Sequence, residues 1–196
     1  MTVQDATPAA QAIALTWTTT QTGAAVTTFA HLGWVDLGGT EWTIHANVDP
    51  DRYAKYADNP KLAAHPDVFR APGVNLLSYP VTAATDHAAR LLFHAPAFLA
   101  ERFPQMVPAL GWKPRVLASG HTIHEATVAT IEDMSGPFPV IARVDRVLID
   151  LNGGDLNSMT EFLGEGTDRR MVVPVPSIDA TATDVFNQLA DSRSRH

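Results

Sequence analysis

The sequence predicts an α+β fold built on a predominantly antiparallel sheet. Stretches rich in β-branched and aromatic residues alternate with a period of two before residue 50 and again after residue 111. Amphipathic helical patterns lie between these stretches and at the carboxyl end of the chain. Glycine-containing turns join several neighbouring strand patterns, and such turns connect antiparallel strands. We therefore expect one sheet covered by helices from the middle and the C-terminus of the chain.

The clearest hairpin pattern surrounds Gly38-Gly39. Strands are predicted over residues 26–37 and 41–48 on either side of this pair, which is the spacing of a two-residue primed turn. An uninterrupted register from that turn pairs His31 with Ala46. The same register places His31 on the more apolar, inward face and His45 nearer to solvent.

Helices are expected in the middle of the chain. Asp49-Pro50 predicts the start of a short helix, because an aspartate cap followed by proline suits the first helical turn. Residues 61–79 are predicted to form an irregular connection, or short helical pieces with one brief strand. A helical pattern covers residues 83–94, and a second helical run follows the interruption expected at Pro96.

Two long antiparallel strands are predicted after the helical region. They cover residues 115–131 and 138–151 and are joined by a turn at residues 135–137. The apolar positions of the second strand change phase near Asp145-Arg146. We interpret this change as a β-bulge.

The last part of the chain is predicted to mix short elements. Ser158 and Glu161 form a capping-box pattern for a short helix that ends at Gly164. Residues 171–175 are predicted to be an edge strand because they contain a proline. An amphipathic helix is expected over residues 181–190.

Size and composition indicate one globular domain over residues 1–196. Residues 1–9 are expected to be flexible, and residues 191–196 are expected to be a frayed tail. The hydrophobic fraction of 45% and the charged fraction of 18% exclude a disordered chain and a coiled coil. The layout is compatible with a strongly curved sheet of the hot-dog or small-barrel kind, which is an analogy of fold that supports no activity.

Charge and composition exclude several classes of partner. The net charge of −7, with only three lysines, predicts no nucleic-acid binding. No apolar run approaches the roughly 20 residues of a membrane span, and the first residues lack the pattern of a signal peptide. We therefore expect a soluble, cytoplasmic protein. The absence of cysteine excludes disulfides and thiol catalysis, so histidines, carboxylates and hydroxyls remain for any chemistry.

The segment from Ser119 to Glu125 contains the densest group of chemically active side chains. On a helix, His121 and His124 would lie together and could bind one metal ion. The surrounding β-branched residues instead favour a strand, which sends the two histidines to opposite faces. His121 and Glu125 then share the face with the larger apolar groups, expected inward. They lie roughly 13 Å apart along the strand, so each needs a partner on a neighbouring element.

Four further residues are candidate ligand-binding groups. Trp34 and Trp42 lie on the predicted hairpin, and His87 and His94 lie on the predicted middle helix. A purely structural role is open for each, because aromatic residues in sheets often pack in cores. His87 and His94 are separated by roughly 10 Å of helical rise, too far for a two-ligand helical motif. The same structural alternative holds for His31, His121 and Glu125.

These residues lead to three hypotheses. The first is a small enzyme that acts on a neutral or partly apolar organic molecule by histidine acid–base chemistry, with His31, His121 and Glu125 as catalytic groups and no cofactor. Hydrolysis, elimination, isomerisation and cyclisation all fit it. The second is a metal-dependent enzyme whose His/Glu site joins these residues with His87 or His94. The third is a noncatalytic ligand-binding protein or a homo-oligomer, such as a homodimer, assembled through the edge strand and the final helix.

Overall fold

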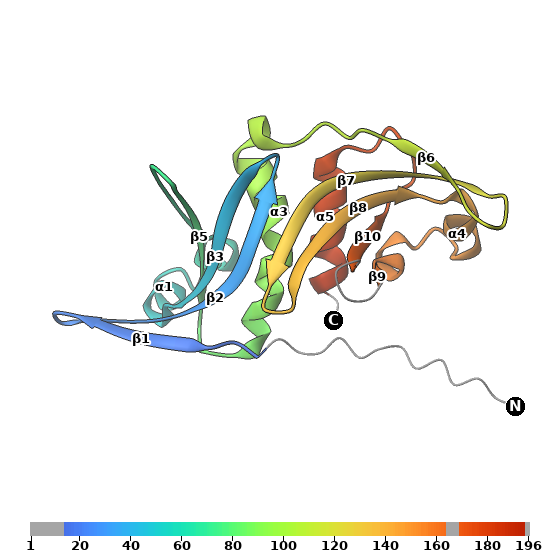
Figure 1. The fold of residues 1–196 in the computed structure, drawn as a ribbon. Coiled ribbons are helices and arrows are strands. Elements are labelled where there is room, and N and C mark those ends of the chain that lie inside the picture. The colour runs from blue at the N-terminus through green and yellow to red at the C-terminus, as the bar shows by residue number, and fades with distance from the viewer. Residues whose placement is uncertain (1–13, 164–168, 195–196) are drawn as a thin grey trace, which may run out of the picture.

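The computed structural model describes residues 14–163 and 169–194. These residues form an α+β fold with a mixed, mostly antiparallel sheet, which confirms the predicted class (Figure 1). The sheet is not closed, because its strand order runs from β4 to β9 without joining these two strands. The barrel alternative is therefore wrong. The segment predicted to be flexible, residues 1–9, lies outside the described residues.

The strands and helices follow one another along the chain with short 3-10 turns between some of them. Their order is β1 (Trp17–Thr22), β2 (Ala25–Leu37), β3 (Thr40–Val48), α1 (Pro50–Lys55), α2 (Pro60–Ala63), β4 (Asp67–Ala71), β5 (Val74–Val81), α3 (Leu91–Arg102), β6 (Lys113–Val116), β7 (Thr122–Asp133), β8 (Gly136–Val144), α4 (Arg146–Leu151), β9 (Glu161–Leu163), β10 (Arg170–Pro174) and α5 (Ala182–Ser194).

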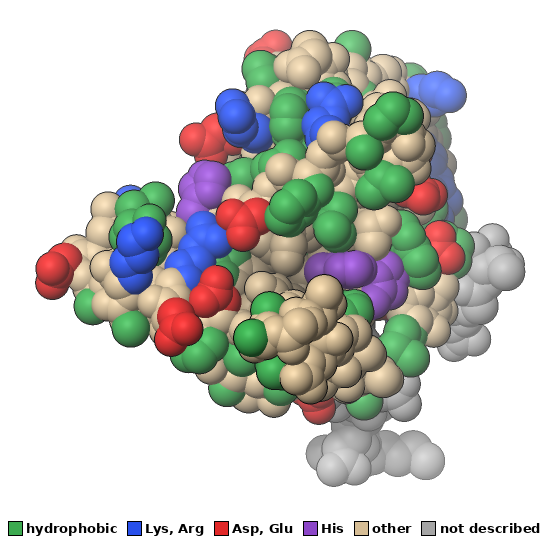
Figure 2. Space-filling model, turned by 90° about the vertical axis from the view of Figure 1, so that its left-hand side faces the viewer, with side chains coloured by type: hydrophobic (Ala, Val, Ile, Leu, Met, Phe, Trp, Pro, Cys, Tyr) green, Lys and Arg blue, Asp and Glu red, His purple; other side chains and the backbone are tan. Residues whose placement is uncertain are grey.

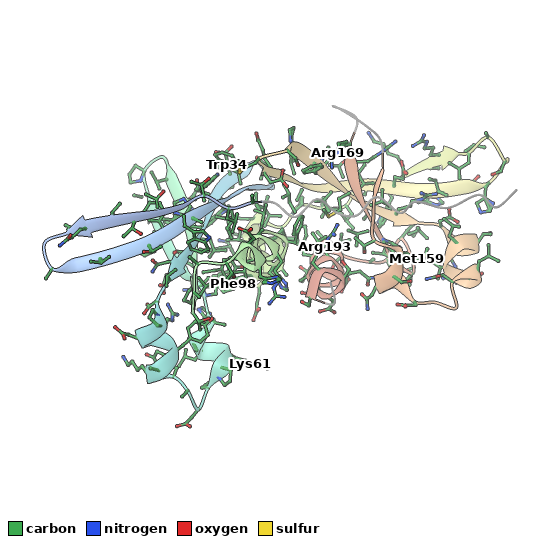
Figure 3. The ribbon with its side chains drawn as sticks, turned by 90° about the horizontal axis from the view of Figure 1, so that it is seen from below. Trp34, Lys61, Phe98, Met159, Arg169 and Arg193 are labelled. Atoms are coloured by element: carbon green, nitrogen blue, oxygen red, sulfur yellow. The ribbon has the colours of Figure 1, made fainter. Side chains whose placement is uncertain are left out.

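One face of the sheet forms the core. Helix α3 packs against β2, β3 and β7, and α5 packs against α3 and β10. Trp42, Leu92 and Phe186 are fully buried between these layers, and burial of each such side chain stabilises the fold by about 1.5–3 kcal/mol. In Figure 3 the helices α3 and α5 lie on one side of the sheet and Trp34 on the other. We call the side of β2, β3 and β5 that faces away from α3 the open face.

The predicted hairpin is confirmed as β2 and β3. Gly38 and Gly39 have φ angles of +61° and +79°, which a primed turn requires and glycine adopts without strain. The register follows the prediction from the turn as far as Gly33, which pairs with Ile44. Local turn chemistry therefore determines this half of the hairpin.

A β-bulge changes the second half of the hairpin. The register shifts between His31 and Gly33, so His31 pairs with His45 and not with Ala46. The bulge turns Leu32 into the core, where it is buried, and turns His31 to the open face. The predicted inward position of His31 is therefore wrong, and both histidines lie on the same side of the sheet.

The long strand predicted over residues 115–131 is two strands. A turn at Gly120 separates β6 from β7, and the two strands pair with each other. A second bulge lies in β7 between Thr127 and Ala129. Ile131 beyond this bulge is in the core, whereas Glu125 before it lies on the opposite face, so its predicted inward position is also wrong.

The phase change near Asp145 marks the end of a strand and the start of a helix. Strand β8 ends at Val144, and α4 begins at Arg146 with Asp145 as its N-cap. The Asp145 carboxylate accepts a hydrogen bond from the backbone N–H of Leu148. The predicted bulge and the predicted continuation of the strand to residue 151 are wrong, because the aspartate cap starts a helical turn directly after Val144.

In the middle of the chain the predicted helix start at Asp49-Pro50 is confirmed. The Asp49 carboxylate caps α1 by accepting from the N–H of Arg52. In residues 61–79 the structure is nearer to the second alternative, because it has the end of α2 and the start of β5; the additional strand β4, which pairs with β5 as a hairpin, was not predicted. Helix α3 continues through Pro96, which is buried on the core side. Its burial offsets the single backbone hydrogen bond that proline removes.

The C-terminal part differs from the prediction at two elements. A 3-10 turn and β9 replace the helix predicted from Ser158, whose end at Gly164 lies outside the described residues. Strand β10 is not an edge strand, because it lies between β8 and β9. Pro174 is accommodated because β9 pairs only with residues 170–172, so no strand needs its missing N–H.

The final helix is confirmed as α5, which continues to Ser194 through the start of the predicted frayed tail. Its apolar stripe, including Val185 and Leu189, is buried against the core. Neither this helix nor any other in the described ranges combines the length and the apolar character needed to cross a membrane.

Candidate functional site

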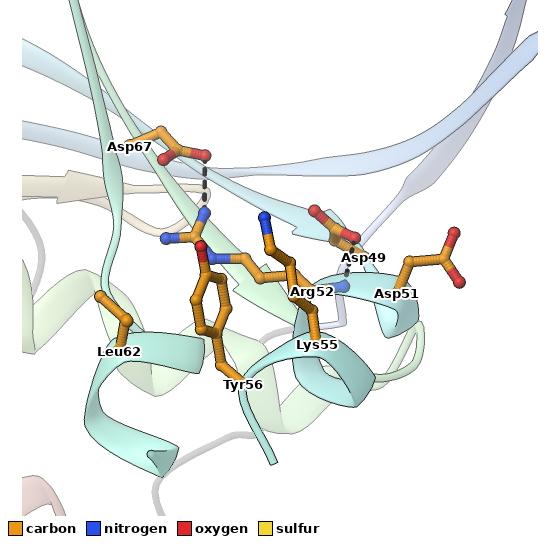
Figure 4. A pocket seen from close by; sticks show the side chains of 7 residues that line it. All are labelled: Asp49, Asp51, Arg52, Lys55, Tyr56, Leu62 and Asp67. Atoms are coloured by element: carbon orange, nitrogen blue, oxygen red, sulfur yellow. Dashed lines mark hydrogen bonds and ion pairs between the residues drawn. The ribbon is translucent and has the colours of Figure 1, made fainter. Parts of the chain in front are cut away.

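Two open hollows mark the surface near α1. The first measures about 440 Å³ and lies between α1, α2 and the start of β4 (Figure 4). A second measures about 340 Å³ and borders the ends of β2 and β3. Arg52 crosses the first hollow and donates to Asp67 at 2.9 Å. None of the site residues predicted from the sequence lines either hollow. The first is lined by Asp49, Asp51, Arg52, Lys55, Tyr56, Leu62 and Asp67.

A group of aromatic and imidazole rings lies instead on the open face. We call Phe29, His31, Trp34 and His45 the ring patch. The ring centroids of His31 and Trp34 are 4.2 Å apart, and those of His31 and His45 are 5.5 Å apart with the planes at 90°. Phe29 stacks on His45 at 5.6 Å. The four rings therefore form one contiguous surface on two neighbouring strands.

The ring patch contains a buried polar atom without a protein partner. Nε2 of His31 is inaccessible to solvent and has no hydrogen-bond partner among the described residues. The Oδ1 atom of Asn47, two residues beyond His45 on the same face, is also inaccessible to solvent and without a partner among the described residues, and Asn47 itself lines the second hollow. A buried polar atom without a partner costs about 1–3 kcal/mol. Two such atoms therefore lie on this face of the sheet, close to the rings.

The ring patch also keeps its imidazoles uncharged. Burial lowers the pKa of His31. Burial lowers the pKa of His45 as well, and the neighbouring His31 lowers it further. Both rings are therefore neutral at pH 7, with a nitrogen lone pair free to accept a hydrogen bond or bind a cation. Figure 2 shows histidine side chains at the surface of the molecule, next to hydrophobic ones.

His121 lies far from the ring patch. It precedes β7, and β2 meets β7 only at the other end, where Trp34 pairs with Glu132. At about 3.3 Å per residue the stretch from Thr122 to Glu132 alone spans roughly 30 Å. His121 Nε2 lies 3.5 Å from Asp145 Oδ1, which also accepts from the N–H of Leu148. The structure therefore does not bring His31 and His121 into one pocket.

Glu125 belongs to a separate group of charged residues. It pairs with Lys113 on β6 and with Arg143 on β8, and its carboxylate lies 3.4 Å from Arg115 Nη1. Its neighbours are thus cationic side chains of adjacent strands. Glu125 therefore lies among cationic side chains, and it is beside neither histidine of the ring patch.

The remaining candidates have distinct surroundings. Trp42 is 0% exposed and stacks on Phe103 in the core, so it packs the fold. His87 is exposed on the turn before α3. His94 is half-buried on α3, where Ser194 Oγ of α5 lies 3.3 Å from its Nε2. Only Trp34 of these predicted ligand-binding residues belongs to the ring patch.

His94 predicts a pH dependence of stability. Burial lowers the pKa of His94, the charge of Arg90 lowers it further, and Asp191 opposes the shift. Between the lowered value and the ordinary value of about 6.5 the unfolded chain binds more protons. The stability from neutral His94 is therefore present above the ordinary value and lost as the pH falls through the folded-state value. We expect His94→Gln to lose less stability than wild type between pH 7.5 and pH 5, measured by urea unfolding.

A matched control for this prediction is His87→Gln, which changes an exposed histidine on the segment preceding α3. This variant should keep the wild-type pH dependence, to which His31 and His45 also contribute. Equal pH dependence of His94→Gln and wild type would contradict the assignment to His94.

Comparison with protein-family models, curated proteins and solved structures found no match. The described residues contain no group of three or more histidines, aspartates or glutamates close enough to hold a metal ion. The His/Glu site of the second hypothesis is therefore not assembled among them.

Two members of the ring patch, Phe29 and His45, were missed as functional candidates from the sequence. The signal that could have found them is Gly33, because an isolated glycine inside a strand pattern often marks a bulge. A bulge at that position moves His31 onto the face of His45.

Proposed function

We propose that the protein is a noncatalytic binding protein that holds a small planar organic molecule on the ring patch. The observation that carries the proposal is the gathering of four half-buried rings, with the unpartnered Nε2 of His31, on a sheet face away from the helices α3 and α5. Flat rings offer offset or edge-to-face contacts to a planar ligand, worth about 0.5–1.5 kcal/mol per aromatic pair beyond burial.

The charges beside the ring patch favour an uncharged or cationic ligand. Asp36 follows Trp34 on the same face of β2, and Glu132 pairs with Trp34 from β7. Their carboxylates repel an anion. Nε2 of His31 and Oδ1 of Asn47 are buried without a protein partner, and a rotation of these side chains would bring both atoms into polar contact with the ligand.

Indole provides a test as a neutral planar probe. Tryptamine and indole-3-acetate are its cationic and anionic counterparts. We expect indole and tryptamine to shift the amide resonances of His31, Trp34 and His45, and indole-3-acetate to bind more weakly. Trp34→Ala removes one aromatic contact and should weaken indole binding about five- to tenfold.

Tyr56→Ala is the matched control, because Tyr56 is an aromatic residue of the hollow between α1 and α2. It should leave indole binding unchanged. Resonance shifts that map to this hollow, or binding that depends on Tyr56 and not on Trp34, would show that the ring patch is not the site.

A histidine acid–base enzyme at the ring patch is the second candidate function. It is favoured by the unpartnered Nε2 of His31, which would accept a proton from a molecule held against Trp34 once a rotation of the imidazole exposes this nitrogen. Its catalytic pair would be His31 with His45, in place of His31 with His121. The two functions differ in the fate of the ligand: a binding protein releases it unchanged, whereas an enzyme converts it.

A further inference from the structure

His31 and His45 form a directly opposed pair on adjacent antiparallel strands. Side chains opposed in this way have Cβ atoms about 4.5–5.5 Å apart and leave the sheet on the same side. The bulge beside Gly33 creates the pair, because the uninterrupted register would oppose His31 to Ala46. Two imidazoles thus reach outward from neighbouring backbone positions.

The spacing of the two rings matches the requirement of a shared metal ion. Two imidazoles that bind one ion at about 2.0–2.1 Å from each ring nitrogen have centroids roughly 5 Å apart. The observed separation of 5.5 Å differs from this value by an amount that small side-chain rotations can supply. By contrast, the side chain of His121 contacts an aspartate and that of His94 contacts a serine hydroxyl.

The neighbouring rings limit the movement of both imidazoles. Trp34 packs against His31 with an interplanar angle of 61°, and Phe29 stacks on His45 at 20°. Restricted rings lose less conformational entropy when they bind an ion. Burial also favours their neutral form, which is the form that binds metals.

We propose that His31 and His45 together form a two-histidine site for a divalent first-row transition-metal ion. The inference rests on the ring patch of the proposed function and adds an inorganic ligand to it. No third histidine, aspartate or glutamate completes the group among the described residues. Water or the planar ligand therefore occupies the other coordination positions. Imidazole donors and the general order of metal affinities then favour Cu²⁺ over Ni²⁺ and Zn²⁺.

The test is titration of tag-free protein with Cu²⁺, Ni²⁺ and Zn²⁺, followed by calorimetry and by electron paramagnetic resonance of the Cu²⁺ complex. We expect one bound Cu²⁺ with two nitrogen donors. His31→Ala and His45→Ala should each weaken Cu²⁺ binding by about tenfold or more, because each leaves a single imidazole. His87→Ala removes an exposed histidine and should change nothing.

His31→Phe and His45→Phe repeat the test with the aromatic packing retained. If these variants fold as wild type and bind Cu²⁺ as wild type does, the proposal is overturned. A spectrum with a single nitrogen donor also overturns it. Indole binding in the presence of EDTA reports on the proposed function alone, so failure of the metal site and failure of the ring patch as a ligand site are distinguishable.

Discussion

Gly33→Ala should destabilise the protein by about 3 kcal/mol or more. A Cβ atom at this position would lie 2.1 Å from the backbone carbonyl oxygen of Glu132 and 3.0 Å from Leu92 Cδ2. The φ angle of +147° is also one that residues with a side chain rarely adopt. Since backbone cannot rotate away like a flexible side chain, β2 and β7 would have to separate. Urea unfolding monitored by circular dichroism measures the loss.

Gly73→Ala is the control for conformational strain alone. Gly73 has a φ angle of +76°, and nothing lies within 4 Å of an added Cβ. Its cost should stay near 1 kcal/mol, the usual penalty of the left-handed region. Equal losses in the two variants would show that the approach to Glu132 contributes nothing.

The contact at Gly33 has consequences beyond stability. Strand β2 meets β7 through only three registered pairs, from Trp34 to Asp36, directly after the bulge. The close approach of β7 therefore holds the bulge that places His31 opposite His45. In Gly33→Ala protein that still folds, we expect both the pairing of β2 with β7 and the ring patch to be lost.

Gly33 also shows what could be predicted from the sequence. The Gly38-Gly39 turn is a local signal, and the register that it determines is observed as far as Gly33. The bulge shifts by one residue the pairing of every β2 position that lies farther from the turn than Gly33. The uninterrupted periodicity therefore assigned His31 to the wrong face. The position of β7 beside Gly33 is a tertiary contact that no local pattern contains.

Other differences have the same physical origin. The start of α1 and the apolar stripe of α5 depend on residues close in sequence, and both were predictable. The place of β10 between β8 and β9 depends on pairing across the chain, so its proline suggested an edge that the structure does not have. The ring patch depends on both local sequence and tertiary contacts. Its residues are close in sequence, but they share one face of the sheet only because of the bulge.

The helix after Asp145 had a local signal that strand periodicity obscured. An aspartate followed by apolar residues at helical spacing is typical of a capped helix, and Val147, Leu148 and Leu151 have this spacing. These three side chains are exposed in α4, whereas Ile149 is buried. The aspartate cap, and not a buried apolar stripe, is therefore the signal that marks this helix. Asp145 itself becomes the residue on which the local structure depends.

Asp145→Ala should cost about 3–5 kcal/mol, the second large effect that we expect. The Asp145 side chain is 5% exposed and accepts from Arg143 Nη2 at 2.9 Å, while the Arg143 side chain is 14% exposed. Removal of the carboxylate leaves a largely buried guanidinium without this partner, and Nε of Arg143 already has none among the described residues. It also removes the cap that accepts from the N–H of Leu148. Urea unfolding at pH 7 measures the combined loss.

Asp49→Ala is the control that measures the loss of a helix cap alone, without the loss of the partner of a buried charge. Asp49 caps α1 in the same way, through the N–H of Arg52 at 3.0 Å, so its loss should cost about 1 kcal/mol. Asp145→Asn should fall between the two alanine variants, because asparagine keeps a capping oxygen but not the charge. The double variant with Asp145→Leu and Arg143→Met should recover most of the loss, since it leaves no buried charge unpaired. If Asp145→Ala costs no more than Asp49→Ala, the Arg143 pair contributes nothing and Asp145 acts as a cap alone.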